Sequence, residues 1–454
     1  MAQEKEGLKG RIAQVLAENR VMNIASEGEA SPWCVTVFLV EEGLDILCLV
    51  EATSQTMANL KHNPRLAFTI NRQVPDRFLQ GMGLATVAGL PADHPELFAR
   101  MCQKVSDIEG FVQAIPGLTI VRIITERLSL TDMPAGVFPR VTLYRRGEQW
   151  LLKEEMGVLR GPKAWLLATR PWSFPASLVP MLVGAALAHR AGHFSGDLLV
   201  LTLLGGLLFH IGANLFNTYF DFRRGVDSAL DADDRILVDG ILRPRDVAAA
   251  ALVAFAIGVG IGGYLASQAG WPIVALGGVG LALGVFYTAD PLGYKYRGLG
   301  DLGIFAAFGP VLVLGAYMVQ TEKLDLLPFL FAVPLGLIID AILHANNLRD
   351  AQADRRSGAV TLAQLLGEDA SRWAYAVLVL APYAFVAAFG AVVSPWMLLP
   401  IVTIPLAWKA VRQMRIRKEE LRPAIALLPQ RTAQLSMIFG LLLAVGVLAS
   451  SLSQ

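Results

Sequence analysis

The sequence has few charged residues for its length. Asp, Glu, Lys and Arg make up 17% of its 454 residues, whereas hydrophobic residues make up 54%. Soluble domains carry about a quarter charged residues, so this composition predicts several membrane-spanning helices. The formal net charge is only +1, and the sequence has no basic strip with interleaved aromatic residues. We therefore expect no nucleic-acid partner.

Cysteine is scarce too. Cys34, Cys48 and Cys102 lie far apart and form no Cys-x-x-Cys pair, so reduced cytosolic thiols are favoured over a disulfide or a metal site. The N-terminal stretch MAQEKEGLKG is polar and lacks the apolar core of a signal peptide.

Composition divides the chain into a soluble part and a membrane part. Residues 1–145 are expected to form a soluble domain, residues 146–163 a charged connector, and residues 164–454 a membrane domain. The connector is interpreted either as an amphipathic helix on the membrane surface or as a solvated linker.

Nine apolar segments approach the length of about 20 residues that crosses a bilayer. They are residues 165–189, 197–220, 246–267, 271–289, 302–320, 325–345, 372–393, 396–411 and 432–452. Basic residues gather in alternate loops, 221–245, 290–301, 346–371 and 409–431, which the positive-inside rule makes cytoplasmic. Nine spans then predict a multi-pass protein of the inner (plasma) membrane, with a cytoplasmic N-terminal domain and an extracytoplasmic Gln454.

Two similar polar stretches lie at the predicted cytoplasmic ends of the second and sixth segments. In HIGANLFNTYFDFRRGVD, Asn217 and Asp221 are four residues apart and share a helix face. In HANNLRDAQADRRSG, Asp350 and Asp354 repeat this spacing. Carboxylates at one depth on two helices can hold Mg²⁺ together with phosphate oxygens. The alternative is that these acids are solvated, or paired with the adjacent arginines.

A third polar stretch, YTADPLGYKYRGLGD, joins the fourth and fifth segments. Lys295 and Arg297 in this stretch could hold diphosphate oxygens or could be topology charges. Arg170, before the prolines of the first segment, is a candidate for binding an acceptor carboxylate bidentately, or a juxtamembrane charge.

Two polar residues lie inside the sixth segment. Asp340 is ten residues before Asp350, about 15 Å deeper along a helix, and His344 follows one turn later. An acid inside the membrane is a functional candidate. Acceptor deprotonation is one interpretation, and a structural hydrogen bond is the other.

On these motifs the membrane half resembles the UbiA-type intramembrane prenyltransferases, and within them the 1,4-dihydroxy-2-naphthoate polyprenyltransferases. NLFNTYFDFRRGVD and NNLRDAQADRRSGAVTLA match the two Asp-rich motifs, and ATRPWSFPASLVPMLVG and YTADPLGYKYRGLGD also match this branch. The resemblance covers roughly residues 164–452. The sequence departs from the family pattern in two places: Thr218 stands where Asp is frequent, and Ala359-Val360 replaces a common basic pair.

The resemblance implies roles for particular residues. The catalytic residues would be Asn217, Asp221, Asp227, Asn347, Asp350 and Asp354, with the four aspartates as Mg²⁺ ligands. The diphosphate-binding residues would be Lys295, Arg297, Arg223 and Tyr294. The acceptor-binding residues would be Arg170, Asn214, Asp340 and His344.

The implied reaction is Mg²⁺-dependent transfer of a polyprenyl group from an isoprenyl diphosphate to an aromatic quinone precursor. The favoured acceptor is 1,4-dihydroxy-2-naphthoate, which would place the enzyme in menaquinone biosynthesis. Another acceptor within the superfamily is an open alternative. A transporter and a membrane-anchored flavoprotein are alternatives from other classes.

The N-terminal domain is expected to be a small α+β barrel. Residues 8–25 predict an amphipathic helix, TSQTMANLKHNP predicts a short helix, and PWCVTVFLV, LDILCLV, RLAFTINR and GLATVAG predict strands. Over residues 8–130 this pattern resembles the FMN-binding split barrel of the pyridoxamine 5′-phosphate oxidase-like superfamily. The whole chain is thus expected to be a split barrel followed by an all-α bundle of nine transmembrane helices.

The barrel resemblance implies a cofactor and a partner. FMN would be bound at the interface of a homodimer, and the FMN-binding residues would be Ser54, Lys61, Arg65 and Gln80. A basic residue is often found at the position of Thr56. Because that phosphate-binding charge is missing, we expect flavin binding to be weak or absent.

Overall fold

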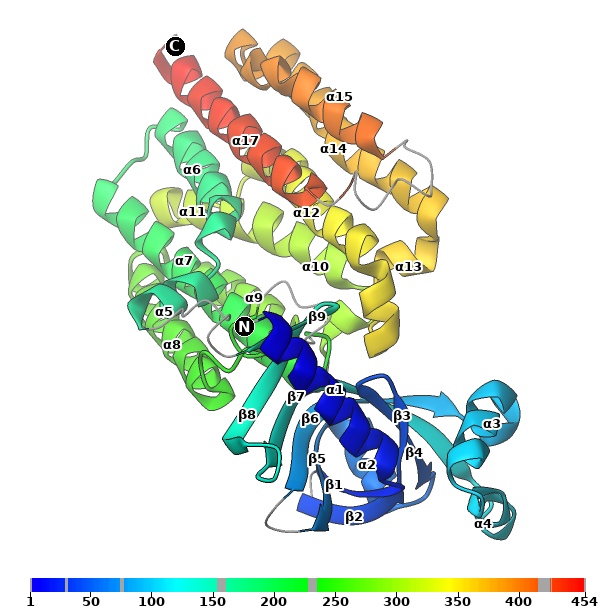
Figure 1. The fold of residues 1–454 in the computed structure, drawn as a ribbon. Helices are drawn as coiled ribbons and strands as arrows, with labels where there is room; N and C mark the ends of the chain where they lie inside the picture. Colours follow the sequence, from blue (N-terminus) through cyan, green and yellow to red (C-terminus); the bar gives the residue numbers. More distant parts are fainter. Residues whose placement is uncertain are drawn as a thin grey trace. The chain divides into compact units, whose positions relative to one another are not determined.

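The computed structural model describes residues 2–28, 32–73, 77–152, 161–227, 235–414, 425 and 427–452. The chain forms two compact units (Figure 1). The first comprises Met1–Arg160 and Asp221–Ile241, and the second comprises Gly161–Phe220 and Leu242–Gln454. Residues 153–160 of the predicted connector lie outside the described residues.

The described part of the first unit is built on one antiparallel sheet in the order β2-β1-β5-β6-β7-β4-β3, with β8 pairing β7 and β9. Apolar side chains alternate along the strands, so that Met22 and Ile24 of β1 point into the core. The strands are β1 Val21–Glu27, β2 Pro32–Phe38, β3 Val40–Glu42, β4 Asp45–Glu51, β5 Arg65–Gln73, β6 Arg77–Gly89, β7 Leu118–Asp132, β8 Val137–Arg146 and β9 Gln149–Leu152. The predicted β-rich N-terminal domain is confirmed as a half-barrel.

Short helices complete this unit. They are α1 Ala2–Glu18, α2 Gln55–His62, η1 Pro91–Asp93, α3 Pro95–Lys104 and α4 Ile108–Ala114. The three cysteines are free, and burial raises the pKa of the Cys48 thiol to about 12.

The second unit is helical in its described residues. Its elements are α5 Pro162–Ala168, η2 Pro171–Ser173, α6 Pro175–Arg190, α7 Gly196–Arg223, α8 Pro244–Ala269, α9 Trp271–Phe286, η3 Tyr294–Tyr296, α10 Gly300–Ala306, the π-helical turn η4 Ala307–Val311, α11 Leu312–Thr321, α12 Leu326–Ser357, α13 Leu362–Leu366, α14 Glu368–Val392, η5 Pro395–Thr403, α15 Ile404–Gln413 and α17 Leu428–Leu452. Helix α7 continues past Phe220, so its last three residues belong to the first unit.

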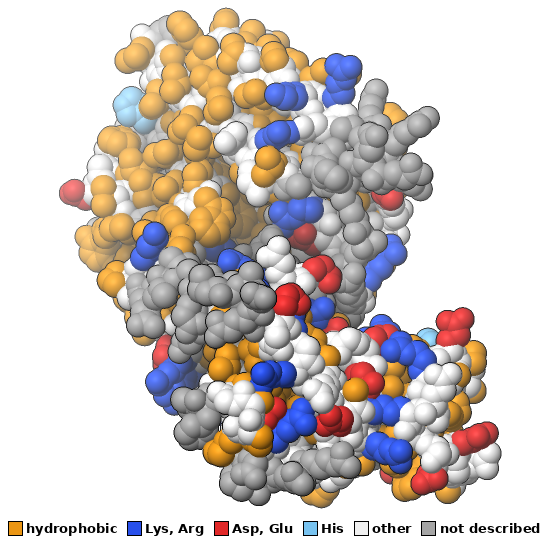
Figure 2. Space-filling view, in the orientation of Figure 1, with side chains coloured by type: hydrophobic (Ala, Val, Ile, Leu, Met, Phe, Trp, Pro, Cys, Tyr) orange, Lys and Arg blue, Asp and Glu red, His pale blue; other side chains and the backbone are white. Residues whose placement is uncertain are grey.

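Apolar side chains cover the outside of the helical unit as well as its core. Phe331 and Phe389 stack inside with ring centroids 4.1 Å apart, whereas Leu252 and Ile257 of α8 are 60% and 50% exposed. Figure 2 shows hydrophobic side chains over most of the visible face of these helices, and charged side chains spread over the barrel. An apolar exterior is what lipid contact requires.

The predicted count of nine spans is not supported. Among the described residues, six helices are long and apolar enough to cross a membrane, and a seventh span is present if α5, η2 and α6, bent by 53°, are counted as one. The nine segments are helical where predicted, but two of them are too short. The fourth forms only the 16 residues of α9, and the eighth changes from the 3-10 helix η5 to α15.

Prolines lie at the breaks in the first and eighth segments. Pro171 and Pro175 start η2 and α6, and Pro395 starts η5, which contains Pro400. Because proline lacks the N–H that an α-helix needs, it bends or ends the helix in which it occurs. Hydropathy measures the apolar length of a segment and does not detect such breaks.

Candidate active site

A hydrogen-bonded network on α7 fixes the turn that carries Arg170. Asn214 Nδ2 donates to Thr169 O at 3.0 Å and to Ser173 Oγ at 3.1 Å, and Ser173 Oγ donates to Arg170 O at 2.7 Å. His210 lies between Ser173 and Ser177, with its ring nitrogens 3.1 Å and 2.6 Å from their hydroxyls. Since Ser173 already donates to Arg170, His210 Nε2 is the donor to Ser173. The hydroxyl of Ser177 lies against the other ring nitrogen, Nδ1, so both nitrogens of His210 are hydrogen-bonded.

Arg170 is held beside the first acidic motif. Its backbone is left-handed, with φ 55°, and its Nη2 donates to Thr218 Oγ1 at 3.2 Å. Thr218 is fully buried and precedes Asp221 by one turn of α7. Thr218, which stands where the family often has Asp, therefore provides a hydroxyl that accepts a hydrogen bond from the Arg170 guanidinium.

The third polar stretch contacts the first motif. Lys295 Nζ donates to Asn217 Oδ1 at 2.8 Å and lies 5.8 Å and 5.6 Å from the ring centroids of Tyr287 and Tyr296. Tyr294 donates its hydroxyl to Leu283 O at 2.7 Å, and burial raises the pKa of this phenol.

The same stretch also pairs with the segment after the second motif. Arg297 forms a parallel bridge with Val360, and Gly298 N donates to Val360 O at 2.8 Å. Arg297 Nη2 donates to Pro291 O at 2.9 Å. Ala359-Val360, which replaces the basic pair common in the family, thus connects the stretch with Arg297 to the segment after the second motif through backbone hydrogen bonds.

A buried cluster centred on Asp301 lies on α10, α12 and α14. His344 Nδ1 is 2.7 Å from Asp301 Oδ1, His344 Nε2 is 3.1 Å from Ser371 O, and Asn347 Nδ2 donates to Asp301 Oδ2 at 3.1 Å. A carbonyl only accepts, so Nε2 carries a proton. The hydrogen bond between His344 Nδ1 and Asp301 Oδ1 contains a second proton. The pair is therefore either imidazolium–carboxylate or imidazole–carboxylic acid.

Asp301 was not a predicted site residue. The sequence feature that could have identified Asp301 is its position at the end of YTADPLGYKYRGLGD, just before an apolar segment. His344, with both ring nitrogens engaged, fits the structural interpretation given to it above. Asp340 is 5% exposed, and its Oδ1 has no hydrogen-bond partner among the described residues.

The acids of the second motif lie near the end of α12. Arg349 donates to both Asp350 oxygens at 2.7 Å, so the sequence alternative of pairing with an adjacent arginine applies to Asp350. This carboxylate is 40% exposed. The backbone carbonyl of Asp354 accepts from Ser357 Oγ and Ala359 N, both at 2.9 Å.

The first motif continues to the end of α7 and into a tight turn. Asp221 is 3% exposed, and its carbonyl accepts from Asp227 N at 3.2 Å. Arg223 ends the helix and is exposed. The side chains of Asn217 and Asp221 share one face of α7, about 6 Å apart along the axis.

The chemistry of these side chains suits a hard cation. The described residues contain no group of three His, Cys, Asp or Glu side chains close enough to hold a metal ion. Mg²⁺ in phosphate-transferring sites commonly uses one or two carboxylates and completes its shell with substrate phosphates and water. Asp221 and Asp350 each supply a carboxylate, the ligand type that such a Mg²⁺ uses.

The four residues assigned to FMN lie on α2, β5 and β6 of the half-barrel. Ser54 caps α2 by accepting from Met57 N, Lys61 lies in the last turn of that helix, and Gln80 Oε1 accepts from Arg140 at 3.3 Å. The three guanidinium nitrogens of Arg65 all donate to protein oxygens. These bonds use three of the five N–H donors of the guanidinium. The FMN site and the homodimer stay predictions.

Comparison with known proteins identifies the family. Residues 177–438 match the UbiA prenyltransferase family. The UbiA prenyltransferase domain-containing protein 1 homolog of Drosophila melanogaster is 44% identical over 290 residues, which are 62% of this chain and 78% of that protein. The mouse UbiA prenyltransferase domain-containing protein 1 is 40% identical over 63% of this chain and 84% of its own.

Solved structures with a similar fold include a UbiA homolog from Aeropyrum pernix K1 without ligand. It is 18% identical, with a TM-score of 0.47, and the match covers 61% of this chain and 97% of that one. The family match covers more than half of the chain, and the long apolar helices are those of a protein that crosses the membrane repeatedly. The chain therefore belongs to the UbiA prenyltransferase family and is a multi-pass membrane prenyltransferase.

Proposed function

We propose that this prenyltransferase transfers a polyprenyl group from an isoprenyl diphosphate to 1,4-dihydroxy-2-naphthoate, a step of menaquinone biosynthesis. The hydrogen bond between Lys295 and Asn217 carries the diphosphate part of this proposal. It brings a cation to the membrane side of the first acidic motif, where a dianionic headgroup needs charge-assisted donors.

The diphosphate leaves with the electron pair of the C–O bond. Lys295 and Arg297 would stabilise the charge that develops on it, supported by Arg223 and Tyr294. Mg²⁺, which Asp221, Asp227, Asp350 and Asp354 would hold, supplies further neutralisation of that charge when bound. The apolar helices exclude water, which would otherwise capture the allylic cation.

The acceptor side uses the residues around α7 and α12. Arg170 would bind the carboxylate of the acceptor, and the hydrogen bonds of Asn214 hold the turn from which Arg170 projects. After an electron-rich ring carbon forms the new C–C bond, a proton must leave. Asp340 is the candidate to take it, because its Oδ1 has no hydrogen-bond partner among the described residues.

An acceptor panel tests this proposal. Purified full-length protein, Mg²⁺ and a radiolabelled polyprenyl diphosphate are incubated with 1,4-dihydroxy-2-naphthoate, 4-hydroxybenzoate or no acceptor, and both prenylated product and diphosphate are measured. We expect product and equimolar diphosphate with the naphthoate only, and neither in EDTA. Product with 4-hydroxybenzoate alone would overturn the acceptor, and transport of a solute without diphosphate release would favour the transporter alternative.

We propose that the protein lies in the inner (plasma) membrane with its N-terminal domain in the cytoplasm. The basic loops support this orientation, and an odd number of crossings, such as the seven that the described helices allow, places Gln454 outside. A reporter fused after Gln454 is expected to be active only in its extracytoplasmic form, and one fused before Met1 only in its cytoplasmic form. Both reporters on one side would mean an even number of crossings.

A further inference from the structure

We propose that Arg65 of the half-barrel is a positioning residue for the first acidic motif, and that it holds the turn from Asp221 to Asp227 in place. This inference rests on the proposed role of those two aspartates. It also gives the half-barrel a function that needs no flavin.

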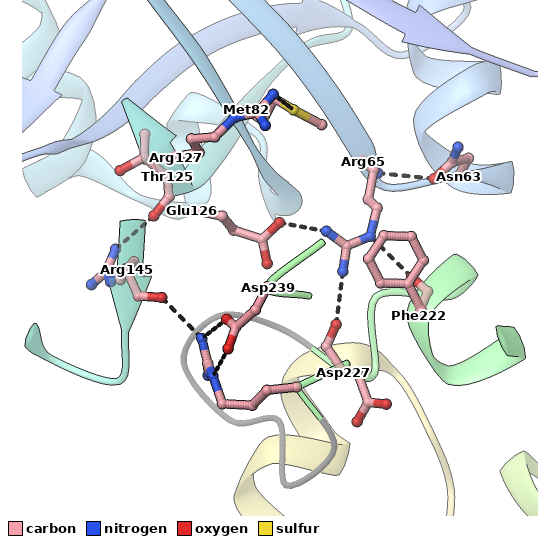
Figure 3. Close-up of polar contacts among 11 residues, drawn as sticks. Asn63, Arg65, Met82, Thr125, Glu126, Arg127, Arg145, Phe222, Asp227 and Asp239 are labelled. Carbon is pink, nitrogen blue, oxygen red and sulfur yellow. Dashed lines mark hydrogen bonds and ion pairs between the residues drawn. The ribbon is translucent and has the colours of Figure 1, made fainter. Parts of the chain in front are cut away.

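The contacts of Arg65 are directed at this turn. Its Nε donates to Phe222 O at 3.0 Å and its Nη2 to Asp227 O at 2.8 Å, while Nη1 donates to Glu126. The guanidinium carbon lies 3.8 Å from the centroid of the Phe222 ring, a cation–π distance. Figure 3 shows Arg65 between Glu126 on one side and Phe222 and Asp227 on the other.

The turn is the end of a helix whose last carbonyls need donors. Helix α7 stops at Arg223, and its final carbonyls have no partner within the helix. Gly225 N donates to Phe222 O at 3.2 Å and Asp227 N donates to Asp221 O at 3.2 Å. Arg65 adds a second donor to Phe222 O, with a positive charge at the negative end of the helix dipole. Two bonds from one rigid fork therefore fix both ends of the turn relative to each other.

The packing of Gly225 is independent evidence that the turn is built for this surface. Gly225 has φ +70°, a conformation that favours glycine. A Cβ at this position would lie 2.9 Å from Pro64 Cγ and 3.0 Å from Leu84 Cδ2. Pro64 precedes β5 and Leu84 lies on β6, opposite Arg65. The turn is thus pressed against the strand that carries Arg65.

Glu126 keeps Arg65 in its position. The side chains of Arg65 and Glu126 are 12% and 10% exposed, so solvent screens this ion pair less than a surface pair. Arg65 Nη1 is used by Glu126, which leaves Nε and Nη2 aimed at the turn (Figure 3).

The second described part of the segment Asp221–Ile241, which begins at Arg235, is also hydrogen-bonded to a strand of the half-barrel. Arg235 Nη2 donates to Arg145 O of β8 at 3.1 Å, and Arg235 pairs with Asp239 at 2.7 Å and 3.2 Å. Arg145 itself pairs with Asp45 at 2.6 Å. Strands β5 and β8 therefore hold the segment at both described ends.

The test compares Arg65→Met and Arg65→Lys with the control Arg100→Met in the full-length enzyme. Arg100 also forms an ion pair within the barrel, with Glu42 at 3.2 Å, but contacts the segment in no described interaction. Three quantities are measured: the Mg²⁺ concentration giving half-maximal prenyl transfer, amide hydrogen exchange of residues 221–227, and FMN retained after desalting.

We expect Arg65→Met to raise the half-maximal Mg²⁺ concentration about 10-fold, as for the loss of a partner that orients a metal ligand. Exchange in residues 221–227 should accelerate by a similar factor, while exchange in β5 and β6 stays unchanged. High Mg²⁺ should restore most of the rate. Arg65→Lys, which keeps the charge but not the fork, should give intermediate values, and Arg100→Met should match the wild type.

Wild-type Mg²⁺ dependence and exchange in Arg65→Met would overturn the proposal. Loss of retained FMN in that variant, with the other two readouts unchanged, would make Arg65 a flavin ligand instead. If Arg65→Met does not fold, Arg65→Lys and Glu126→Gln must show the same pattern. Hydrogen exchange needs no substrate, so it tests the proposal even if the enzyme proves to use another acceptor.

Discussion

Asp221→Ala and Asp350→Ala are each expected to abolish detectable prenyl transfer, a loss of at least about 10³-fold. Each change removes a carboxylate that would hold Mg²⁺ against the leaving diphosphate. Transfer is measured with radiolabelled polyprenyl diphosphate, and the thermal unfolding midpoint in detergent verifies that each variant is folded. EDTA should abolish wild-type activity in the same way, and added Mg²⁺ should restore it.

Asp197 provides a matched control for the first of these changes. It lies in the first turn of α7, on the same helix as Asp221 but at its opposite end, and it is exposed. Asp197→Ala should therefore retain wild-type transfer. If Asp221→Ala or Asp350→Ala were as active as this control, the metal–diphosphate mechanism would be wrong.

Asp301→Ala is expected to lower the free energy of unfolding by about 2–5 kcal/mol, because two buried polar groups are left without a partner at roughly 1–3 kcal/mol each. The side chain of Asp301 is 4% exposed and that of His344 fully buried. Without the carboxyl group, His344 Nδ1 and Asn347 Nδ2 both lose their hydrogen-bond partner in an apolar environment. The thermal unfolding midpoint in detergent measures the effect.

Asp301→Asn separates the hydrogen bonds from the charge. Its amide oxygen can accept from Asn347 and its NH₂ group can donate to an unprotonated His344 Nδ1, so we expect a smaller loss of stability. If Asp301→Ala unfolded at the wild-type midpoint, the cluster would not stabilise the fold. The carboxylate would then be better explained as part of the chemistry.

The sequence predicted the polar residues of the site better than it predicted their partners. The spacing of Asn217 and Asp221 predicted one face of a helix, and α7 has that face. Lys295, singled out as a possible diphosphate ligand, donates to Asn217 of the first motif. The link from Asp301 to His344 spans 43 residues, and no local spacing signals a pair formed by the packing of α10 against α12.

Arg65 illustrates the same limit in the half-barrel. Its position after Asn63-Pro64 suggested a phosphate ligand by resemblance, whereas two of its acceptors lie 157 and 162 residues later in the chain. A guanidinium binds carbonyl, carboxylate and phosphate oxygens through the same donors. Residue type alone therefore cannot tell which of them it meets.

The order in which the chain visits its two units has a consequence for synthesis. The chain leaves the first unit at Arg160, returns at Asp221 and leaves again after Ile241. The contacts of Gly225 with Pro64 and Leu84 can therefore form only after α6 and α7 have emerged from the ribosome. Domains generally fold in order as they are made, but here the N-terminal unit can be completed only after the first apolar helices have been delivered to the membrane.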